Sequence, residues 1–497
     1  MSGRSLTIGR WLADRARMTP DRVAIRYLDA ELTYAELDRR ANRLAAGLTQ
    51  RGLARGDRLA TLTSTSPDHV VTLFACARLG VALQPISWRL AAAEIAYQLE
   101  DAEPSLLLVS GEHENLVRAA GATIETVRIG DPTLEAVAEV DDAARDDDPL
   151  LLVYTSGTTG KPKGALLTHA NCFWTNLSFD RTTSLRDDDI VLQVLPQFHV
   201  GGWNVQPLLA WWKGATVVLE PAFDAGRALG LIAEHRVTTM MGVPATYLFL
   251  AQEQGFADAD LSSLRLAVVG GAPMPEALLE TWVERGIEIV QGYGLTEAAP
   301  NVLCLPPEAA RRKLGFAGKP YPHVDVALRD PDSGALVDGP ATGELVVKGP
   351  NVFAGYWRNA EATAAAFADG WLLTGDVAER DAEGYYRIAG RIKDMVISGG
   401  ENVYPAEIED VLHAHPAVLE AAVVGVPDER WGEACAAFVV LRPGAAATEG
   451  ELRALCGDRL ARFKVPKTFA FVDALPRSSM GKVLKDELRT DATGVAR

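Results

Sequence analysis

The sequence predicts a large α/β domain followed by a small α+β domain, and three observations lead to this expectation. The chain has 497 residues, more than one hydrophobic core normally supports, so at least two domains are expected. Short apolar runs typical of strands alternate with helical patterns as far as residue 290, which indicates layered, mostly parallel sheets. From Val324 the pattern changes to short strands and Gly-rich turns, and a compact α+β unit follows from Arg391.

The large domain is expected to contain a series of buried strands with helices between them. Thr33 and Glu36 have capping-box spacing and predict the start of a helix that Gly52 ends. A strand at 58–63 and a helix at 67–79 follow. Further strands are expected at 105–109, 150–154, 190–195, 215–219, 237–241, 266–269 and 287–290. A small β-rich subdomain then completes this domain.

The small domain is expected to begin with a helix at 405–413, because Pro405 suits the first helical turn. Strands at 420–426 and 437–441, a helix at 450–462 and a strand at 469–472 follow. The expected domains are therefore residues 1–390 and 391–497.

Composition and charge exclude several classes of protein. The net charge of −17 argues against a nucleic-acid partner and against strong binding to an anionic membrane. Five widely spaced cysteines form no CxxC pair, which favours a reducing compartment and gives no zinc site. No N-terminal apolar stretch suggests a signal peptide or a membrane span, so a cytoplasmic protein is expected, with at most weak peripheral membrane contact.

Residues 154–164 form a loop that indicates phosphate binding. They read YTSGTTGKPKG and follow an apolar strand. Glycines let the backbone approach phosphates closely, hydroxyl groups donate hydrogen bonds, and lysines neutralise negative charge. The spacing is not that of the common nucleotide P-loop, because Pro162 stands where a Ser or Thr would follow the lysine. The loop alone indicates phosphate handling and no particular reaction.

Six more motifs follow this loop in a fixed order. They are GGAPMP at 270–275, QGYGLTE at 291–297, TGD at 374–376, GRIKD at 390–394, SGGENVYPAEIE at 398–409 and PRSSMGK at 476–482. In this order the chain resembles the adenylate-forming superfamily of acyl-CoA synthetases, luciferases and peptide-synthetase adenylation domains, and is most similar to bacterial fatty acyl-CoA ligases. The resemblance runs from about residue 6 to 488 and implies a layered αβα domain with a mobile C-terminal domain.

The resemblance implies an ATP and AMP site in which the loop holds the β- and γ-phosphates. Asp376 accepts the ribose hydroxyls with support from Arg391, Tyr293 stacks on adenine, Thr296 contacts the α-phosphate, and Thr155 and Glu297 lie near Mg²⁺. Lys482 bridges the substrate carboxylate and the α-phosphate. The full nucleotide set is Thr155, Ser156, Gly157, Thr158, Thr159, Gly160, Lys161, Lys163, Gly271, Ala272, Pro273, Gln291, Gly292, Tyr293, Gly294, Thr296, Asp376, Arg391 and Lys482.

The chemistry fits these implied roles. A carboxylate that attacks an α-phosphate is one anion approaching another, so positioning and charge neutralisation should supply most of the catalysis. No general base is needed, because the carboxylic acid is already ionised at neutral pH. The expected catalytic residues are Lys482, His199, Thr155 and Glu297.

The acyl pocket is expected around the motif PQFHVGGW at 196–203. The resemblance places His199 beside the carboxylate and the thiol entrance, and Trp203 at the gate of an acyl tunnel, although Trp203 also fits a core position. The expected lining is apolar, which suits a fatty or aryl tail. It comprises Phe198, His199, Trp203, Val243, Thr246, Tyr247, Gly292 and Leu295. The absence of an Asp in this motif argues against an amino-acid substrate.

The C-terminal domain is expected to supply the thiol step. The resemblance implies a hinge at Lys393 and coenzyme A contacts at Gly399, Gly400, Arg462 and Lys464. The leading hypothesis is a medium- or long-chain fatty acid–CoA ligase of fatty acid metabolism that uses ATP, Mg²⁺ and coenzyme A. An aryl or arylpropenoic acid–CoA ligase (benzoate, salicylate, coumarate or succinylbenzoate type), acyl transfer to a separate carrier protein, and a silent nucleotide-binding regulator stay open. A homodimer is one candidate oligomeric state.

Overall fold

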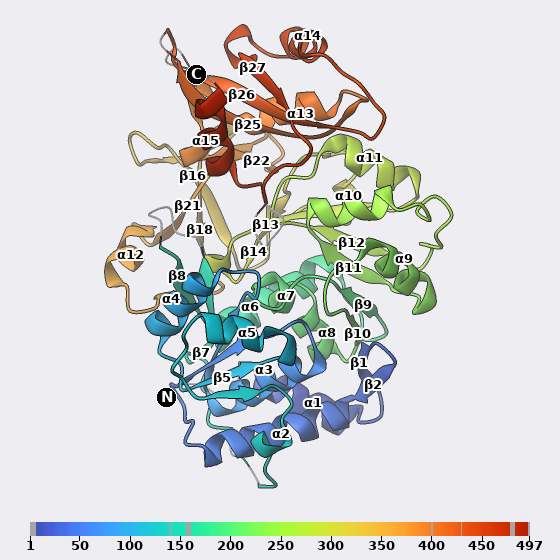
Figure 1. The fold of residues 1–497 in the computed structure, drawn as a ribbon, viewed down its shortest axis with the longest axis vertical. Coiled ribbons are helices and arrows are strands. Elements are labelled where there is room, and N and C mark those ends of the chain that lie inside the picture. Colours follow the sequence, from blue (N-terminus) through green and yellow to red (C-terminus); the bar gives the residue numbers. More distant parts are fainter. Residues whose placement is uncertain are drawn as a thin grey trace.

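The computed structural model describes residues 6–138, 140, 142–155, 161–398, 401–428, 430–477 and 483–495. Figure 1 shows a large body built from the N-terminal and central parts of the chain, with the C-terminal sheet and helices seated at one end. The expected combination of a large α/β domain, a β-rich subdomain and a small α+β domain is confirmed. The domain boundary expected between residues 390 and 391 stays a prediction.

Two large sheets form the body of the N-terminal part. In the described residues, the first has the strand order β15-β14-β13-β12-β11-β9-β10-β1-β2, and the run from β13 to β1 is parallel. Its strands are β1 (Val23–Tyr27), β2 (Ala30–Thr33), β9 (Ile190–Gln193), β10 (Thr216–Leu219), β11 (Thr239–Gly242), β12 (Leu266–Val269), β13 (Ile289–Gly294), β14 (Asn301–Cys304) and β15 (Lys319–Pro320).

The second large sheet has the order β19-β8-β7-β4-β3-β5-β6, with its central strands parallel. At one edge β8 runs antiparallel to both β7 and β19. Its strands are β3 (Arg58–Leu62), β4 (Ala82–Ile86), β5 (Leu106–Val109), β6 (Thr126–Arg128), β7 (Pro149–Thr155), β8 (Lys163–Thr168) and β19 (Gly355–Tyr356).

Helices cover these sheets, and one contiguous apolar core joins both of them. Thr33 caps α2 by accepting a 3.2 Å hydrogen bond from the Glu36 backbone N–H, as its spacing predicts. The shared core includes Phe74, Trp203, Trp211 and Leu303. The helices are α1 (Gly9–Met18), α2 (Tyr34–Gln50), α3 (Pro67–Leu79), α4 (Ala92–Ala102), α5 (Glu114–Ala119), α6 (His169–Thr183), α7 (Gly201–Asn204), α8 (Pro207–Lys213), α9 (Ala225–Glu234), α10 (Pro244–Gln252) and α11 (Glu276–Glu284).

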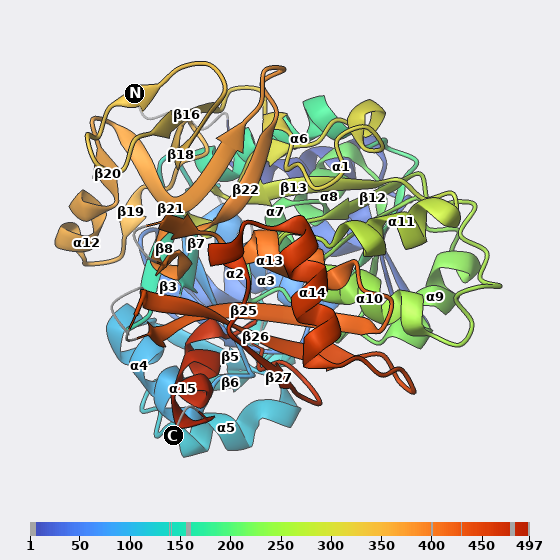
Figure 2. The ribbon, with the colours of Figure 1, turned by 90° about the horizontal axis from the view of Figure 1, so that it is seen from above.

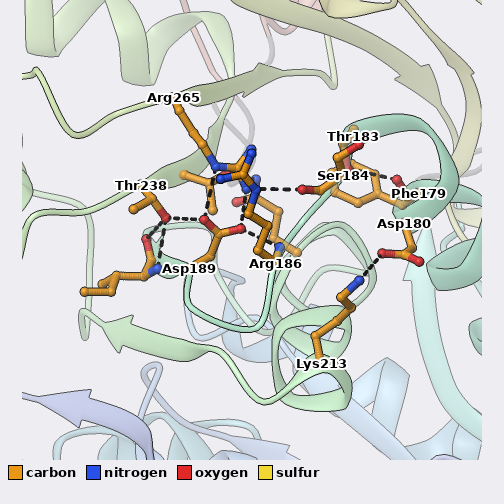
Figure 3. A network of polar contacts seen from close by, with 12 residues as sticks. Phe179, Asp180, Thr183, Ser184, Arg186, Asp189, Lys213, Thr238 and Arg265 are labelled. Atoms are coloured by element: carbon orange, nitrogen blue, oxygen red, sulfur yellow. Dashed lines mark hydrogen bonds and ion pairs between the residues drawn. The ribbon is translucent and has the colours of Figure 1, made fainter.

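A polar network fixes the start of β9 to its neighbours (Figure 3). Asp189 is almost fully buried, and its Oδ1 accepts hydrogen bonds from Thr238 Oγ1 at 2.7 Å and from Arg265 Nε at 3.2 Å. Its Oδ2 accepts from the Arg186 backbone N–H at 2.6 Å. A buried carboxylate needs such partners, because an unpaired one carries a large desolvation cost. The network therefore holds the three adjacent strands β9, β11 and β12 in register.

An antiparallel sheet forms the β-rich subdomain expected from residue 324 onward. Its strand order is β17-β16-β18-β21-β20, and β22 pairs with the other part of β21. The elements are β16 (Asp325–Arg329), β17 (Leu336–Val337), β18 (Ala341–Lys348), β20 (Phe367–Ala368), β21 (Trp371–Arg380), β22 (Tyr386–Arg391) and the helix α12 (Ala360–Ala365).

The C-terminal sheet has helices on both faces, as Figure 2 shows from above. Along β25, Val423 faces the core beneath α13 and α14, whereas Val424 faces the core beneath α15, which is the alternation of a buried strand. The elements are β23 (Val396–Ser398), β24 (Glu401–Val403), α13 (Pro405–His413), β25 (Val418–Asp428), β26 (Gly432–Leu441), α14 (Glu449–Arg459), β27 (Thr468–Phe471) and α15 (Lys485–Val495).

A cleft of about 520 Å³ separates the C-terminal elements from α11 and β22. Its walls carry many carboxylates, among them Glu276 and Glu280 on α11 and Glu407 and Asp410 on α13, together with Arg387. Partial desolvation in the cleft and the neighbouring Glu276 raise the pKa of the exposed Asp410 to about 6. Carboxylates from both sides therefore line the same cleft, together with the guanidinium groups of Arg387 and Arg459.

All five cysteines are buried, and they form no disulfide. Burial raises the pKa of Cys76, Cys172, Cys304 and Cys435 to about 12 and that of Cys456 to about 11. Across the described ranges, no helix combines the length and apolar character that crossing a bilayer requires.

Candidate active site

The two arms of the glycine-rich loop are the end of β7 and the start of β8. Thr155 pairs with Lys163 in the β7–β8 register, so both lie at the same end of the hairpin. The ammonium groups of Lys161 and Lys163 lie 5.5 and 5.3 Å from the ring centroids of Tyr97 and Tyr356, within the range of cation–π attraction. Five loop residues predicted to bind phosphate lie outside the described residues, namely Ser156, Gly157, Thr158, Thr159 and Gly160.

Glu297 lies directly against this hairpin. Thr155 Oγ1 donates a 3.2 Å hydrogen bond to Glu297 Oε1, and Tyr356 Oη donates a 2.9 Å hydrogen bond to the same oxygen. A hydroxyl and a carboxylate are hard oxygen donors of the kind that Mg²⁺ accepts. Within the described ranges, no group of three or more His, Cys, Asp or Glu side chains could hold a metal ion. The donor set thus fits an ion held mainly by phosphates, with one carboxylate from the protein.

Asp376 is the centre of a second polar cluster. Its side chain is 8% exposed, its Oδ2 accepts a 2.6 Å hydrogen bond from Tyr293 Oη, and its Oδ1 lies 3.1 Å from Arg391 Nε. The β21–β22 register places Asp376 opposite Arg391. Burial, followed by the charge of Asp376, raises the pKa of Tyr293 well above its usual value, so the phenol stays protonated and donates.

The turn after β12 and the strand β13 connect these clusters. Gly271 adopts a φ of +83°, and Gly271, Ala272 and Pro273 are exposed, as a surface bordering a ligand would be. Gln291 is instead buried: its amide accepts from the Met274 backbone N–H at 3.4 Å and donates to the Phe316 carbonyl at 3.2 Å. Gln291 therefore holds the turn in place. Gly292, Tyr293 and Gly294 lie on β13, and Thr296 begins the short 3-10 helix that carries Glu297.

The predicted acyl-pocket residues divide into a buried and a half-buried group. Trp203 is fully buried, and its indole N–H donates a 2.6 Å hydrogen bond to the Gln197 carbonyl, so its side chain is part of the core. The ring of Phe198 lies 4.6 Å from that of His199. The other members are Val243, Leu295 and Gly292, which are half-buried, and Thr246 and Tyr247, which are buried. Their pocket role stays a prediction.

Two groups near these sites could not be recognised from the sequence. The Arg89 guanidinium lies 5.0 Å from the centroid of Trp88 and 6.0 Å from that of Phe198. Tyr356 joins Lys163 to Glu297, as described above. Neither residue belongs to one of the seven motifs. The only sequence signal is that Tyr356 follows Gly355 in a segment of short strands, which would have suggested a residue with a fixed position.

The C-terminal candidates are only partly described. Lys393 is exposed just after β22, and Arg462 is exposed beside α14. Lys464 forms an ion pair with Glu407, so its ammonium group is engaged within the C-terminal domain. Gly399, Gly400 and Lys482 lie outside the described residues. The structure thus brings Thr155 to Glu297 and Tyr293 to Asp376 and Arg391, while the coenzyme A contacts stay predictions.

Comparison with known proteins identifies the family of the chain that carries these two clusters. Residues 12–357 match the model of the AMP-binding enzyme family, and residues 407–482 match the model of the AMP-binding enzyme C-terminal domain. The chain belongs to this family. It is an enzyme of the adenylate-forming acyl-CoA ligase family, of which ATP and CoA are substrates. The resemblance to the adenylate-forming superfamily is thereby confirmed.

Several relatives of this AMP-binding enzyme cover nearly its whole length. It is 44% identical to a feruloyl-CoA synthase of Amycolatopsis sp. over 98% of this chain and 99% of the relative. It is 42% identical to an indoleacetate–CoA ligase of Aromatoleum aromaticum and 40% identical to the long-chain-fatty-acid–CoA ligase FadD13 of Mycobacterium tuberculosis, each over 97% of this chain and 98% of the relative. The crystal structure of ATP-bound MatB from Rhodopseudomonas palustris superposes with a TM-score of 0.92 at 35% identity over all of both chains.

Proposed function

We propose that this protein is an ATP-dependent aryl or arylpropenoic acid–CoA ligase that works through an acyl-adenylate. This departs from the leading expectation of the sequence, a fatty acid–CoA ligase. The relatives named for feruloyl and indoleacetyl substrates share 44% and 42% identity with the chain, and the fatty-acid ligase shares 40%. The apolar, half-buried candidates Val243 and Leu295 suit a flat aromatic tail as well as an aliphatic one.

One observation carries the adenylation half of the proposal. The motif at 291–297 contributes Tyr293 to the Asp376 cluster and Glu297 to the glycine-rich hairpin. Tyr293 and Glu297 are only four positions apart in the sequence. One lies in a cluster suited to ribose hydroxyls and the other in a cluster suited to metal-bound phosphates. A single nucleotide has these two ends, so the spacing supports a site for ATP that spans both.

We propose the following roles for the residues. Asp376, oriented by Tyr293 and Arg391, accepts the ribose hydroxyls, and Lys161 and Lys163 neutralise the outer phosphates. Thr155 and Glu297 hold Mg²⁺, which when bound supplies further charge neutralisation at the phosphates. Lys482 holds the acid's carboxylate against the α-phosphorus, where an oxygen of the acid forms a bond as the bond to pyrophosphate breaks. The coenzyme A sulfur then attacks the acyl carbon, and AMP leaves.

We further propose that the enzyme acts in the cytoplasm on a free acid and free coenzyme A. Gly399, Gly400, Arg462 and Lys464 are the candidates for coenzyme A contacts, and Lys393 is the candidate hinge between the two half-reactions. A homodimer stays a prediction.

The test is a substrate panel with ATP, Mg²⁺ and coenzyme A, with AMP and acyl-CoA measured by chromatography. We expect ferulate, coumarate or indoleacetate to give a kcat/KM at least about tenfold above laurate and palmitate, a difference of about 1.4 kcal/mol. A preference for laurate or palmitate would instead support the hypothesis of a fatty acid–CoA ligase. ATP-dependent release of pyrophosphate with formation of acyl-adenylate, but without acyl-CoA, would indicate a carrier-protein acceptor, and release of neither pyrophosphate nor AMP with any acid would support a silent regulator.

A further inference from the structure

Tyr356 lies between the two charged groups of the phosphate end of the site. Its hydroxyl donates to Glu297 Oε1 at 2.9 Å, and its ring faces the Lys163 ammonium at 5.3 Å from the centroid. One side chain therefore contacts both the carboxylate proposed to hold Mg²⁺ and the lysine proposed to neutralise phosphate.

The two oxygens of Glu297 have different surroundings. Oε1 accepts from Tyr356 Oη and from Thr155 Oγ1, which approach from β19 and β7. No described residue donates a hydrogen bond to Oε2. A carboxylate whose first oxygen is held by two hydroxyl donors has a fixed plane, so its second oxygen points in one direction.

The backbone around Tyr356 is held on three sides. Tyr356 pairs with Ala165 on β8, and its N–H donates to Thr363 Oγ1 at 2.9 Å. The next residue, Trp357, donates from its N–H to the Gly164 carbonyl at 2.7 Å. Three residues earlier, the Phe353 N–H donates to the Glu297 carbonyl at 2.8 Å. The short strand β19 thus attaches the loop-bearing hairpin to the helix that carries Glu297.

We propose that Tyr356 is a positioning residue for adenylation, which orients Glu297 so that Oε2 meets the metal–ATP complex and sets the distance from Glu297 to Lys163. The proposal rests on the proposed function of this site. It assigns no bond-making step to Tyr356, whose phenol stays outside the reacting atoms.

The test compares Tyr356→Phe with a matched control, Tyr385→Phe. The first variant keeps the ring beside Lys163 and removes only the hydroxyl, whereas the hydroxyl of Tyr385 lies 3.4 Å from Arg312, remote from this cluster. Binding of ATP is measured by calorimetry at graded Mg²⁺ without acid, and Mn²⁺ binding is measured by electron paramagnetic resonance. The two half-reactions are then measured separately, as pyrophosphate release and as thioester formation from supplied acyl-adenylate.

We expect Tyr356→Phe to weaken metal-dependent ATP binding and to lower kcat/KM for pyrophosphate release, each by about tenfold, as is typical for groups that orient a metal ligand. Thioester formation and Tm should stay at the wild-type values, and Tyr385→Phe should match wild type throughout. A second variant, Tyr356→Leu, also removes the ring and should weaken ATP binding further. Metal and ATP binding unchanged in Tyr356→Phe, or equal losses in both half-reactions, would overturn the proposal.

The binding readouts separate this proposal from the proposed function. If wild type bound metal and ATP but activated no acid of any kind, the ligase function would fail while the role of Tyr356 could still be decided by binding. If wild type were active and the Tyr356→Phe variant bound metal and ATP normally, only the role of Tyr356 would fail.

Discussion

The hydroxyl of Tyr293 donates a 2.6 Å hydrogen bond to Asp376 Oδ2. A residue near the end of β13, in one sheet, thus orients a carboxylate on β21, in another sheet. Arg391 fixes the other oxygen of the same carboxylate. The proposed ribose acceptor is therefore held from two sides before any nucleotide binds.

Removal of this carboxylate should weaken the use of ATP. We expect Asp376→Ala to lower kcat/KM for ATP by about 100-fold, because the variant loses charge-assisted hydrogen bonds and leaves Arg391 without its partner. Tyr293→Phe, which keeps the carboxylate, should lose less than about tenfold. Pyrophosphate release at varied ATP measures both, with the exposed Asp325→Ala on β16 as the control. A wild-type KM for ATP in Asp376→Ala would exclude the ribose role.

Lys482 should serve only the first half-reaction. Its charge is needed where two anions approach, and the later attack by a thiol on a mixed anhydride has no such requirement. We expect Lys482→Ala to lower acyl-adenylate formation by at least about 100-fold and to leave thioester formation from supplied acyl-adenylate within about twofold. Lys348→Ala, an exposed lysine on β18, is the matched control. Equal losses in both steps would refute the division of labour.

Two glycines of one motif should respond differently to the same substitution. A Cβ on Gly294 would lie 1.7 Å from the Pro300 carbonyl oxygen, whereas a Cβ on Gly292 would meet nothing closer than 3.6 Å. We expect Gly294→Ala to lower Tm by several degrees, since backbone must move to admit the methyl group, and to lose adenylation. Gly292→Ala should keep the wild-type Tm, and its effect should be confined to the use of the acid and of ATP, since Gly292 belongs to both expected sets of site residues. Thermal unfolding and the substrate panel check both, and equal Tm values for the two variants would contradict this account.

The interdomain cleft should make stability depend on pH through Asp410. Asp410 is exposed on the cleft wall, and its folded pKa of about 6 exceeds the ordinary value of 3.8 because of partial desolvation there and the nearby Glu276, Glu409 and Glu407, which Arg387 only partly offsets. The folded protein therefore binds more protons than the unfolded chain between about pH 4 and 6, and Asp410 costs stability increasingly as pH rises through that window. Above pH 6 the cost is constant.

Asp410→Asn removes this charge and should raise Tm at pH 7.5 by about 1 °C or less, because solvent screens an exposed carboxylate, with a smaller gain at pH 5. Thermal unfolding at the two pH values measures the difference. Asp258→Asn, an exposed aspartate on the surface of the N-terminal domain, should change neither value. A gain that is larger at pH 5 than at pH 7.5 would have the wrong sign and would exclude electrostatic repulsion in the cleft.

The sequence was sufficient to predict elements with strong local signals. The apolar runs at 105–109, 150–154 and 266–269 all form largely buried strands, because runs this short, rich in Leu and Val, suit the interior of a parallel sheet. The Thr33 cap is equally local. The paired strands β1 and β2 were not predicted, since they are short and partly exposed and their pairing depends on contact with β10.

The candidate residues of the nucleotide site could be named from the sequence, and the residues that support them could not. The motifs contain hydroxyl, carboxylate and guanidinium side chains, and these residue types indicate phosphate, metal and ribose contacts. The residues concerned are Thr155, Glu297, Asp376 and Arg391. Tyr356 lies on a two-residue strand that exists only because β8 and Glu297 hold it, so no local pattern marks it. Trp203 is fully buried, which fits the core position that its motif also allowed, while its role at an acyl pocket stays a prediction.

The five buried cysteines have a practical consequence for an enzyme whose proposed second substrate is itself a thiol. With their pKa values raised to about 11 or 12, they are almost entirely uncharged and shielded at neutral pH, and the thiolate is the reactive form. Acyl groups activated in the site are thus not diverted onto the protein's own sulfur atoms. Coenzyme A consumption can then be followed with a thiol-specific chromogenic reagent in the presence of the native enzyme, with little background colour until the protein unfolds.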